Sequence, residues 1–161
     1  TQPILLTTQT GESRPTTFGA LVGSIDSATL APISEIVGID TSLKVTLKTK
    51  NAIPKKGKIL ITISEYWNQG AIDNLKEYFT SITCDTMRVG LRTIDASLFD
   101  CNFFTEPSKV VISGAFDTGI VREGSEISFN INGFRNPIQA NTNFDVFNIY
   151  TTGENERYTV D

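Results

Sequence analysis

The sequence predicts an all-β antiparallel sandwich, and three observations lead to this prediction. From Ser24 onward, short runs of alternating apolar and polar residues recur about every ten residues, a spacing typical of sandwich strands. Gly, Pro, Asn or Asp bounds each run, and these residues favour turns. Apolar residues make up only 39% of the 161 residues, as expected when one face of each strand lies in water.

The first ten residues form a separate extended segment. Threonines surround an apolar triplet, and Pro3 opposes a helix. A polar break at residues 11–15 then indicates a linker or turn. We therefore divide the chain into residues 1–15, an extended N-terminal segment and linker that is a candidate donor strand, and residues 16–161, one sandwich domain. The candidate donor-strand residues are Ile4, Leu5 and Leu6.

Alternation and turn signals place the remaining elements. The strands are expected at residues 18–22, 24–30, 36–40, 41–49, 58–64, 82–91, 97–104, 108–113, 125–132, 143–151 and 157–160. One short helix is expected at residues 70–79, where Ile72, Leu75, Lys76 and Phe79 fall at helical spacing. No apolar stretch approaches the roughly 20 residues that a membrane-spanning helix needs.

Charge is unevenly distributed along the chain. The net charge of −4 argues against general nucleic-acid affinity. Residues 41–60 hold six lysines and no acid, whereas residues 61–161 hold 14 acids against 7 bases. These lysines either protect an edge strand or attract the acidic part of a neighbouring copy. The lysines assigned to assembly are Lys44, Lys48, Lys55, Lys56 and Lys58.

The two cysteines, Cys84 and Cys101, are interpreted as one disulfide in a chain rich in strands and hydroxyl residues. A loop of about 17 residues would contribute roughly 3 kcal/mol by the loop-entropy model. Two buried free thiols are the alternative, and the spacing fits no metal motif. A disulfide predicts an oxidising compartment, so the chain is expected outside the cell or on its surface. It begins without methionine, as a processed product or a fragment does.

Catalytic signals are weak. Histidine is absent, which removes the commonest general base and the His-dependent nucleophilic and metal sites. Asp117, in the sequence Phe-Asp-Thr-Gly, could suggest an aspartic protease, but a turn ending at Gly119 explains it better. We predict no enzyme activity and no cofactor.

Two binding chemistries remain open. Calcium at loop ends would use carboxylates such as Asp40, Asp145 and Asp161, although no spacing specifies a site. Exposed aromatic side chains could stack on sugars, with packing in the core as the alternative. The aromatic candidates are Tyr66, Trp67, Tyr150 and Tyr158. The chain has no Asn-x-Ser/Thr sequon, so its Ser and Thr hydroxyls are the candidate acceptors for O-linked glycans.

Residues 1–10 have three open fates. The segment could be a strand of its own sandwich, a disordered tail, or a strand added to the sheet of a neighbouring copy. In the third case Ile4 and Leu6 would fill core slots of that neighbour. Each copy would be both donor and acceptor, so the contact would be head-to-tail and would propagate into a filament unless a ring closed.

Part of the chain resembles immunoglobulin-like repeat modules of large secreted surface proteins of protists. The resemblance covers residues 25–160 and rests on residues 51–63, on Trp67-Asn68 followed by a cysteine, and on residues 127–137. Its most specific piece is Gly-Phe-Arg-Asn-Pro at residues 133–137. The family implies an immunoglobulin-like sandwich with an extracellular structural or adhesive role. The N-terminal segment lies outside the resemblance and is similar to donor-strand pilins in assembly logic only.

These observations predict an extracellular structural protomer that polymerises head-to-tail through its N-terminal strand, with other copies of itself as partners. The alternative is a carbohydrate- or calcium-binding adhesion module of a larger surface protein.

Overall fold

The computed structural model describes residues 25–34, 36, 38–63, 79–105, 108–135, 147–156 and 159–160. Within these ranges the chain forms strands and one short 3-10 helix. The elements are β1 (Ser27–Pro32), β2 (Asp40–Lys48), β3 (Lys58–Ile63), β4 (Phe79–Cys84), β5 (Met87–Val89), β6 (Arg92–Ile94), η2 (Ala96–Leu98), β7 (Asp100–Thr105), β8 (Ser108–Ser113), β9 (Glu126–Arg135) and β10 (Phe147–Thr152).

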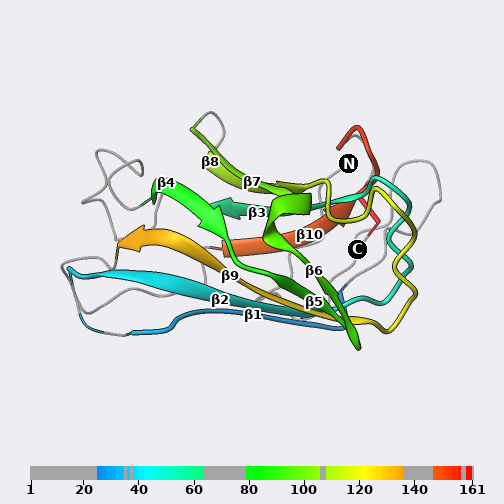
Figure 1. The fold of residues 1–161 in the computed structure, drawn as a ribbon, viewed down its shortest axis with the longest axis horizontal. Helices are drawn as coiled ribbons and strands as arrows, with labels where there is room; N and C mark the ends of the chain where they lie inside the picture. Colours follow the sequence, from blue (N-terminus) through cyan, green and yellow to red (C-terminus); the bar gives the residue numbers. More distant parts are fainter. Residues whose placement is uncertain are drawn as a thin grey trace.

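The described strands form two antiparallel sheets packed face to face (Figure 1). The six-stranded sheet has the order β1-β2-β9-β5-β6, with β4 also paired to β9. The four-stranded sheet has the order β10-β3-β8-β7. Every strand pairing is antiparallel, so the predicted all-β antiparallel sandwich is confirmed.

The core lies between the sheets, where the alternation of β2 and β9 is in register. Leu43 pairs with Ile131, and Val45 pairs with Phe129, so their apolar side chains point to the same face. Leu43 is 1% exposed, and Ile131 is fully buried. The four-stranded sheet meets this layer with further buried residues, among them Ile59, Ile61, Val110, Ile112 and Ile149. Burial of these side chains is the main force that holds the two layers together.

A disulfide joins the two sheets at one side of the sandwich. It links Cys84, at the end of β4, to Cys101 of β7, with a Cα–Cα distance of 5.8 Å. Next to it, the ring of Phe79 on β4 stacks on that of Phe103 on β7, with centroids 4.9 Å apart. The bond therefore connects the six-stranded sheet covalently to an edge strand of the four-stranded sheet.

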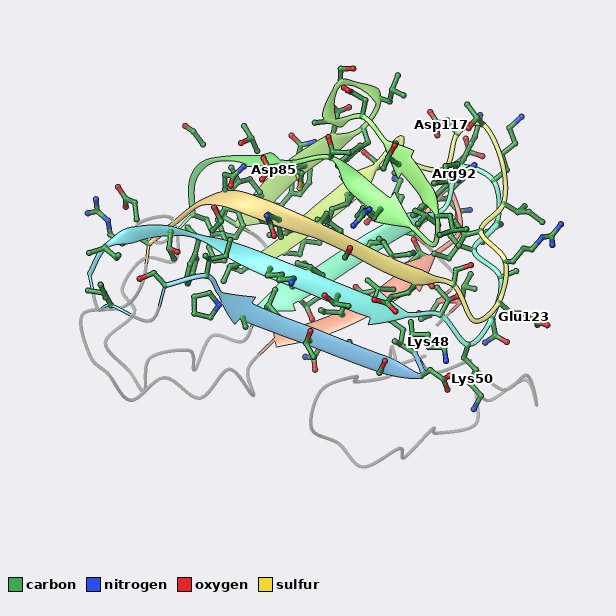
Figure 2. All side chains as sticks on the ribbon, turned by 60° about the horizontal axis from the view of Figure 1, so that its bottom comes forward. Lys48, Lys50, Asp85, Arg92, Asp117 and Glu123 are labelled. Atoms are coloured by element: carbon green, nitrogen blue, oxygen red, sulfur yellow. A yellow bond between two sulfur atoms is a disulfide. The ribbon has the colours of Figure 1, made fainter. Side chains whose placement is uncertain are left out.

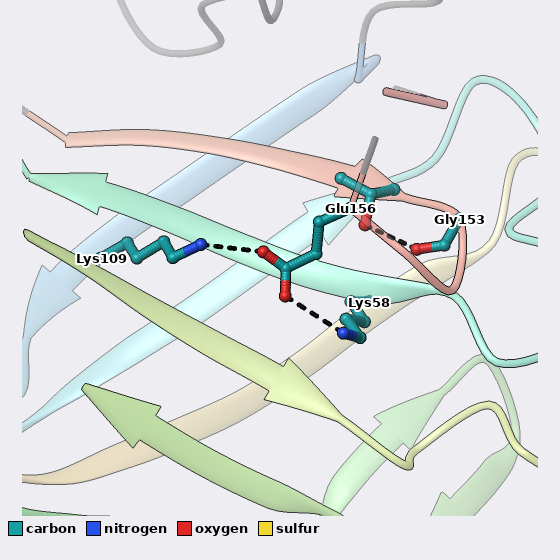
Figure 3. Close-up of polar contacts among 5 residues, drawn as sticks. Lys58, Lys109, Gly153 and Glu156 are labelled. Atoms are coloured by element: carbon teal, nitrogen blue, oxygen red, sulfur yellow. Dashed lines mark hydrogen bonds and ion pairs between the residues drawn. The ribbon is translucent and has the colours of Figure 1, made fainter. Parts of the chain in front are cut away.

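The outer face of the four-stranded sheet carries buried apolar side chains. Leu60 and Val111 alternate with core residues and so point away from the core, yet they are 2% and 5% exposed. The low apolar content led us to expect that the outer faces of both sheets are exposed to water. The outer face of the four-stranded sheet departs from this expectation at Leu60 and Val111. Glu156 lies on this face, between Lys58 and Lys109 (Figure 3). These lysines precede Leu60 and Val111 by two residues.

Glu156 bridges two strands through ion pairs. One carboxylate oxygen accepts from Lys58 Nζ at 3.1 Å, and the other accepts from Lys109 Nζ at 2.8 Å. Burial opposes ionisation and would raise the pKa of Glu156, but the lysine donors prevail and hold that pKa below its ordinary value. Burial, together with the Glu156 charge, raises the pKa of the nearby Tyr150 hydroxyl. The Lys58–Glu156–Lys109 bridge thus links the turn after β10 to β3 and β8.

Several expected elements change in detail. The strand expected at residues 36–40 starts only at Asp40, because Gly38 adopts φ +71° in a turn. The strand expected at residues 82–91 is divided between the end of β4 and β5, and it ends in the tight β5–β6 connection, where Gly90 has φ +59°. Phe79, expected in a helix, begins β4 because its ring packs in the core against Phe103 and Phe134.

Some expectations lie outside the described residues. These include the N-terminal segment with Ile4, Leu5 and Leu6, the strand at residues 18–22, residues 70–78 of the expected helix, and residues 143–146 and 157–158 of two expected strands. Within the described ranges, no helix is long and apolar enough to cross a membrane.

Candidate functional site

A cleft of about 330 Å³ opens at one end of the sandwich. Its wall on one side is β6, and on the other side it is the turn that follows β8. Figure 2 shows Arg92 and Asp117, one from each wall, at the same end of the molecule. The lining residues are Arg92, Thr93, Ile94, Leu98, Gly114, Ala115, Asp117 and Thr118.

Local sequence explains the first wall. The Asp95 carboxylate accepts hydrogen bonds from the Ser97 backbone N–H at 2.9 Å and from the Ser97 hydroxyl at 2.7 Å. These bonds cap η2 at its N-terminus, as Asp does in helices, and they lower the pKa of Asp95. The cap turns the chain directly after β6 and places Leu98 at the cleft, with 66% of the residue exposed.

The second wall depends on a glycine and a buried anchor. Gly114 has φ +89°, and an added Cβ would lie 3.2 Å from both Leu98 O and Phe99 Cα. Only glycine allows the turn to approach η2 this closely. Phe116, which is fully buried, anchors the turn, and its carbonyl accepts a hydrogen bond from Lys56 N at 3.0 Å. The Asp117 N–H bonds the Gly114 carbonyl at 3.2 Å, so Asp117 lies in the turn that its sequence predicts.

The cleft combines polar groups with an apolar contact surface. Arg92 and Asp117 are exposed and supply a guanidinium donor and a carboxylate acceptor. The exposed Thr93 and Thr118 add hydroxyls, and Leu98 adds an apolar surface. This combination suits a ligand that carries many hydroxyls on a carbon skeleton. The described residues hold no group of three or more His, Cys, Asp or Glu that could bind a metal.

Of the predicted binding residues, Asp40 and Tyr150 lie in the described part of the chain. Asp40 forms an ion pair with Arg135 at 2.7 Å, and this hydrogen bond lowers the pKa of Asp40. Asp145 and Asp161, its proposed partners in a calcium site, lie outside the described residues. Among the aromatic candidates, Tyr150 is half-buried on β10, and the other three also lie outside the described residues.

The lysine-rich region is partly neutralised within the chain. Lys56 pairs with Glu154 at 3.0 Å, and Lys58 with Glu156 at 3.1 Å. Lys48 lies 3.9 Å from Asp26. Lys44 and Lys55 are exposed. Three of the five lysines that were assigned to contacts between copies thus form ion pairs with carboxylates of the same chain.

Arg92 and Leu98 were not among the site residues predicted from the sequence. Neither belongs to a motif: Arg92 lies between the strands expected at residues 82–91 and 97–104, and Leu98 lies at the start of the second. The available signals were local ones: the Asp95-x-Ser97 cap, and a glycine directly after the apolar run of β8.

No protein-family model matches the sequence, and no curated protein matches it. Among solved structures, the chain is similar to a family 3a carbohydrate-binding module from the CipA scaffolding of Clostridium thermocellum, with 10% identity and a TM-score of 0.47 over 79% of this chain and 94% of that one. It is also similar to the CBM3b module of scaffoldin ScaA from Acetivibrio cellulolyticus, with 13% identity and a TM-score of 0.45 over 83% and 92%.

A third similar structure is the Actinomyces fimbrial adhesin FimA, with 12% identity and a TM-score of 0.39 over 68% of this chain and 40% of that one. Similarities of this degree carry no inference about the ligand or the activity of this chain.

Proposed function

We propose that this chain is an extracellular, non-catalytic adhesion module that binds carbohydrate in the cleft between β6 and the turn after β8. The observation that carries the proposal is the composition of that cleft. Arg92, Asp117, Thr93 and Thr118 line the cleft together with the exposed Leu98. Sugars present vicinal hydroxyls, which such groups can bind in pairs, and C–H faces that pack on apolar side chains.

The extracellular part of the proposal rests on the disulfide. A bond between Cys84 and Cys101 persists in oxidising compartments and is rare in the cytosol. The absence of histidine in the whole chain supports a binding role rather than a catalytic one.

Glycan-array binding followed by titration calorimetry tests the proposal. We expect Arg92→Ala and Asp117→Asn each to weaken binding by about tenfold, the loss typical of a hydrogen bond to a charged group. The matched controls are Arg122→Ala and Glu123→Gln. Both residues are exposed and lie in the β8–β9 connection, as Asp117 does, but they do not line the cleft. Absence of binding to any glycan, or equal losses in the controls, would contradict the proposal.

A second candidate function is the head-to-tail filament. The edge position of β1 favours it, because β1 pairs only with β2 in the described part of the chain. Strand addition at such an edge gives affinity through main-chain hydrogen bonds. We propose Ile4–Leu6 as the donor and Lys44 and Lys55 as the exposed basic contacts. Electron microscopy of the chain with and without residues 1–10 tests this candidate. Fibres that survive the deletion would rule out the donor-strand role.

A further inference from the structure

The two walls of the cleft carry opposite charges that have no ion-pair partner among the described residues. Arg92 lies on β6, and Asp117 lies in the turn after β8 (Figure 2). Both side chains are exposed, and neither takes part in any ion pair within the described part of the chain. They do not pair with each other either, so the cleft separates a cation from an anion.

Neighbouring opposite charges are engaged elsewhere. The Asp95 carboxylate, directly after β6, is occupied by the two hydrogen bonds that cap η2. On the other wall, the hydrogen bond to Glu154 raises the pKa of Lys56, and the charge of Asp117 adds to this effect. The Lys56 ammonium nevertheless pairs with Glu154, at 3.0 Å. Both charges of the cleft thus remain available to a ligand.

The backbone holds the two charges in place. Arg92 pairs with Val89 in the β5–β6 ladder. Asp117 follows the fully buried Phe116, and its N–H donates to the Gly114 carbonyl at 3.2 Å. Groups that are positioned before binding lose less conformational freedom when a ligand binds. The cleft volume of about 330 Å³ is near the lower end of the range of about 300–1,000 Å³ typical of ligand pockets, which suits a ligand of one or two sugar units.

We propose that the cleft binds a zwitterionic glycan, in which a sugar with a free carboxylate neighbours a sugar with a free ammonium group. The inference rests on the proposed carbohydrate function and adds the chemical class of the sugar. The carboxylate would bind the Arg92 guanidinium, whose planar fork suits a carboxylate, and the ammonium would donate to the Asp117 carboxylate. A purely acidic glycan would face repulsion from Asp117, and a purely basic one would face repulsion from Arg92.

Four forms of one disaccharide test the proposal. The probe is a disaccharide of glucuronic acid and glucosamine, with the amine free or acetylated and the carboxylate free or methyl-esterified. Calorimetric titrations are run at mildly acidic pH, at which the free amine is protonated. We expect each blocked charge to weaken binding about fivefold, the upper end of the range for exposed ion pairs. Both effects should shrink as the salt concentration rises, because salt screens exposed charges.

Two variants assign each charge of the ligand to its wall. In Arg92→Gln, esterification of the carboxylate should no longer change the affinity, whereas acetylation of the amine should still weaken binding about fivefold. Asp117→Asn should show the opposite pattern. The matched controls Arg122→Gln and Glu123→Gln, at exposed positions outside the cleft, should leave both effects intact. Equal effects in both cleft variants, or any loss in the controls, would overturn the assignment.

The outcomes separate this inference from the proposed function. Equal affinity for all four forms would overturn the zwitterionic ligand and leave the cleft as a sugar site. Absence of binding by the form with both charges would also overturn it, and the glycan array would then decide independently whether the cleft binds any sugar. A zwitterionic lysine–glutamate dipeptide that binds more tightly than every disaccharide form would assign the cleft to a peptide ligand and overturn both proposals.

Discussion

Removal of the disulfide should destabilise the sandwich by an amount that follows from its loop length. In the double variant Cys84→Ala with Cys101→Ala, the 17-residue separation is no longer closed in the unfolded chain. The loop-entropy relation gives about 3 kcal/mol for a loop of this size. For a chain of this length, about 2–4 °C of melting temperature corresponds to each kcal/mol, so the midpoint should fall by about 6–12 °C.

Scanning calorimetry and urea denaturation at neutral pH measure this effect. The wild-type chain in excess reductant should match the double variant, because both lack the same constraint. Amide exchange of β2 and β9 below the transition should follow the lower global stability, without a change in which amides are protected. A midpoint that falls by less than about 2 °C would refute the loop-entropy argument for this bond.

Three further predictions concern single residues. Glu156→Gln should lower the free energy of unfolding by about 1–2 kcal/mol at neutral pH, because it removes the charge that pairs with Lys58 and Lys109. In the wild-type chain this contribution should be present above the ordinary glutamate pKa and lost as the pH falls through the lower pKa of the folded state. Urea titrations at several pH values measure it. Gly114→Ala should cost about 1–3 kcal/mol in the same assay, because it places a Cβ at φ +89° against η2. Leu43→Ala should cost about 2–5 kcal/mol through a core cavity, and a loss below 1 kcal/mol would contradict its burial.

The strands were predictable where a local pattern was strong. The alternation Leu43-x-Val45-x-Leu47 predicted both the strand β2 and its buried face, and the structure has both. Phe79 was assigned wrongly because its helical spacing with earlier residues competed with packing against Phe103 and Phe134, which no local pattern reveals.

The candidate site was much less predictable. Arg92 and Asp117 are far apart in the sequence, and only the positions of β6 and the turn after β8 bring them to one cleft. The ion pairs of Lys56 and Lys58 join residues 98 positions apart, so composition revealed the basic segment and not its partners.

The all-β sandwich could be predicted from the sequence alone, because each apolar run shows the two-residue period of a strand. The lack of histidine also limited the available chemistry. The tertiary structure decided which strands are neighbours, and therefore which side chains share a face. The cleft between β6 and the turn after β8 exists only because the two sheets pack on each other, which brings together segments that the sequence separates.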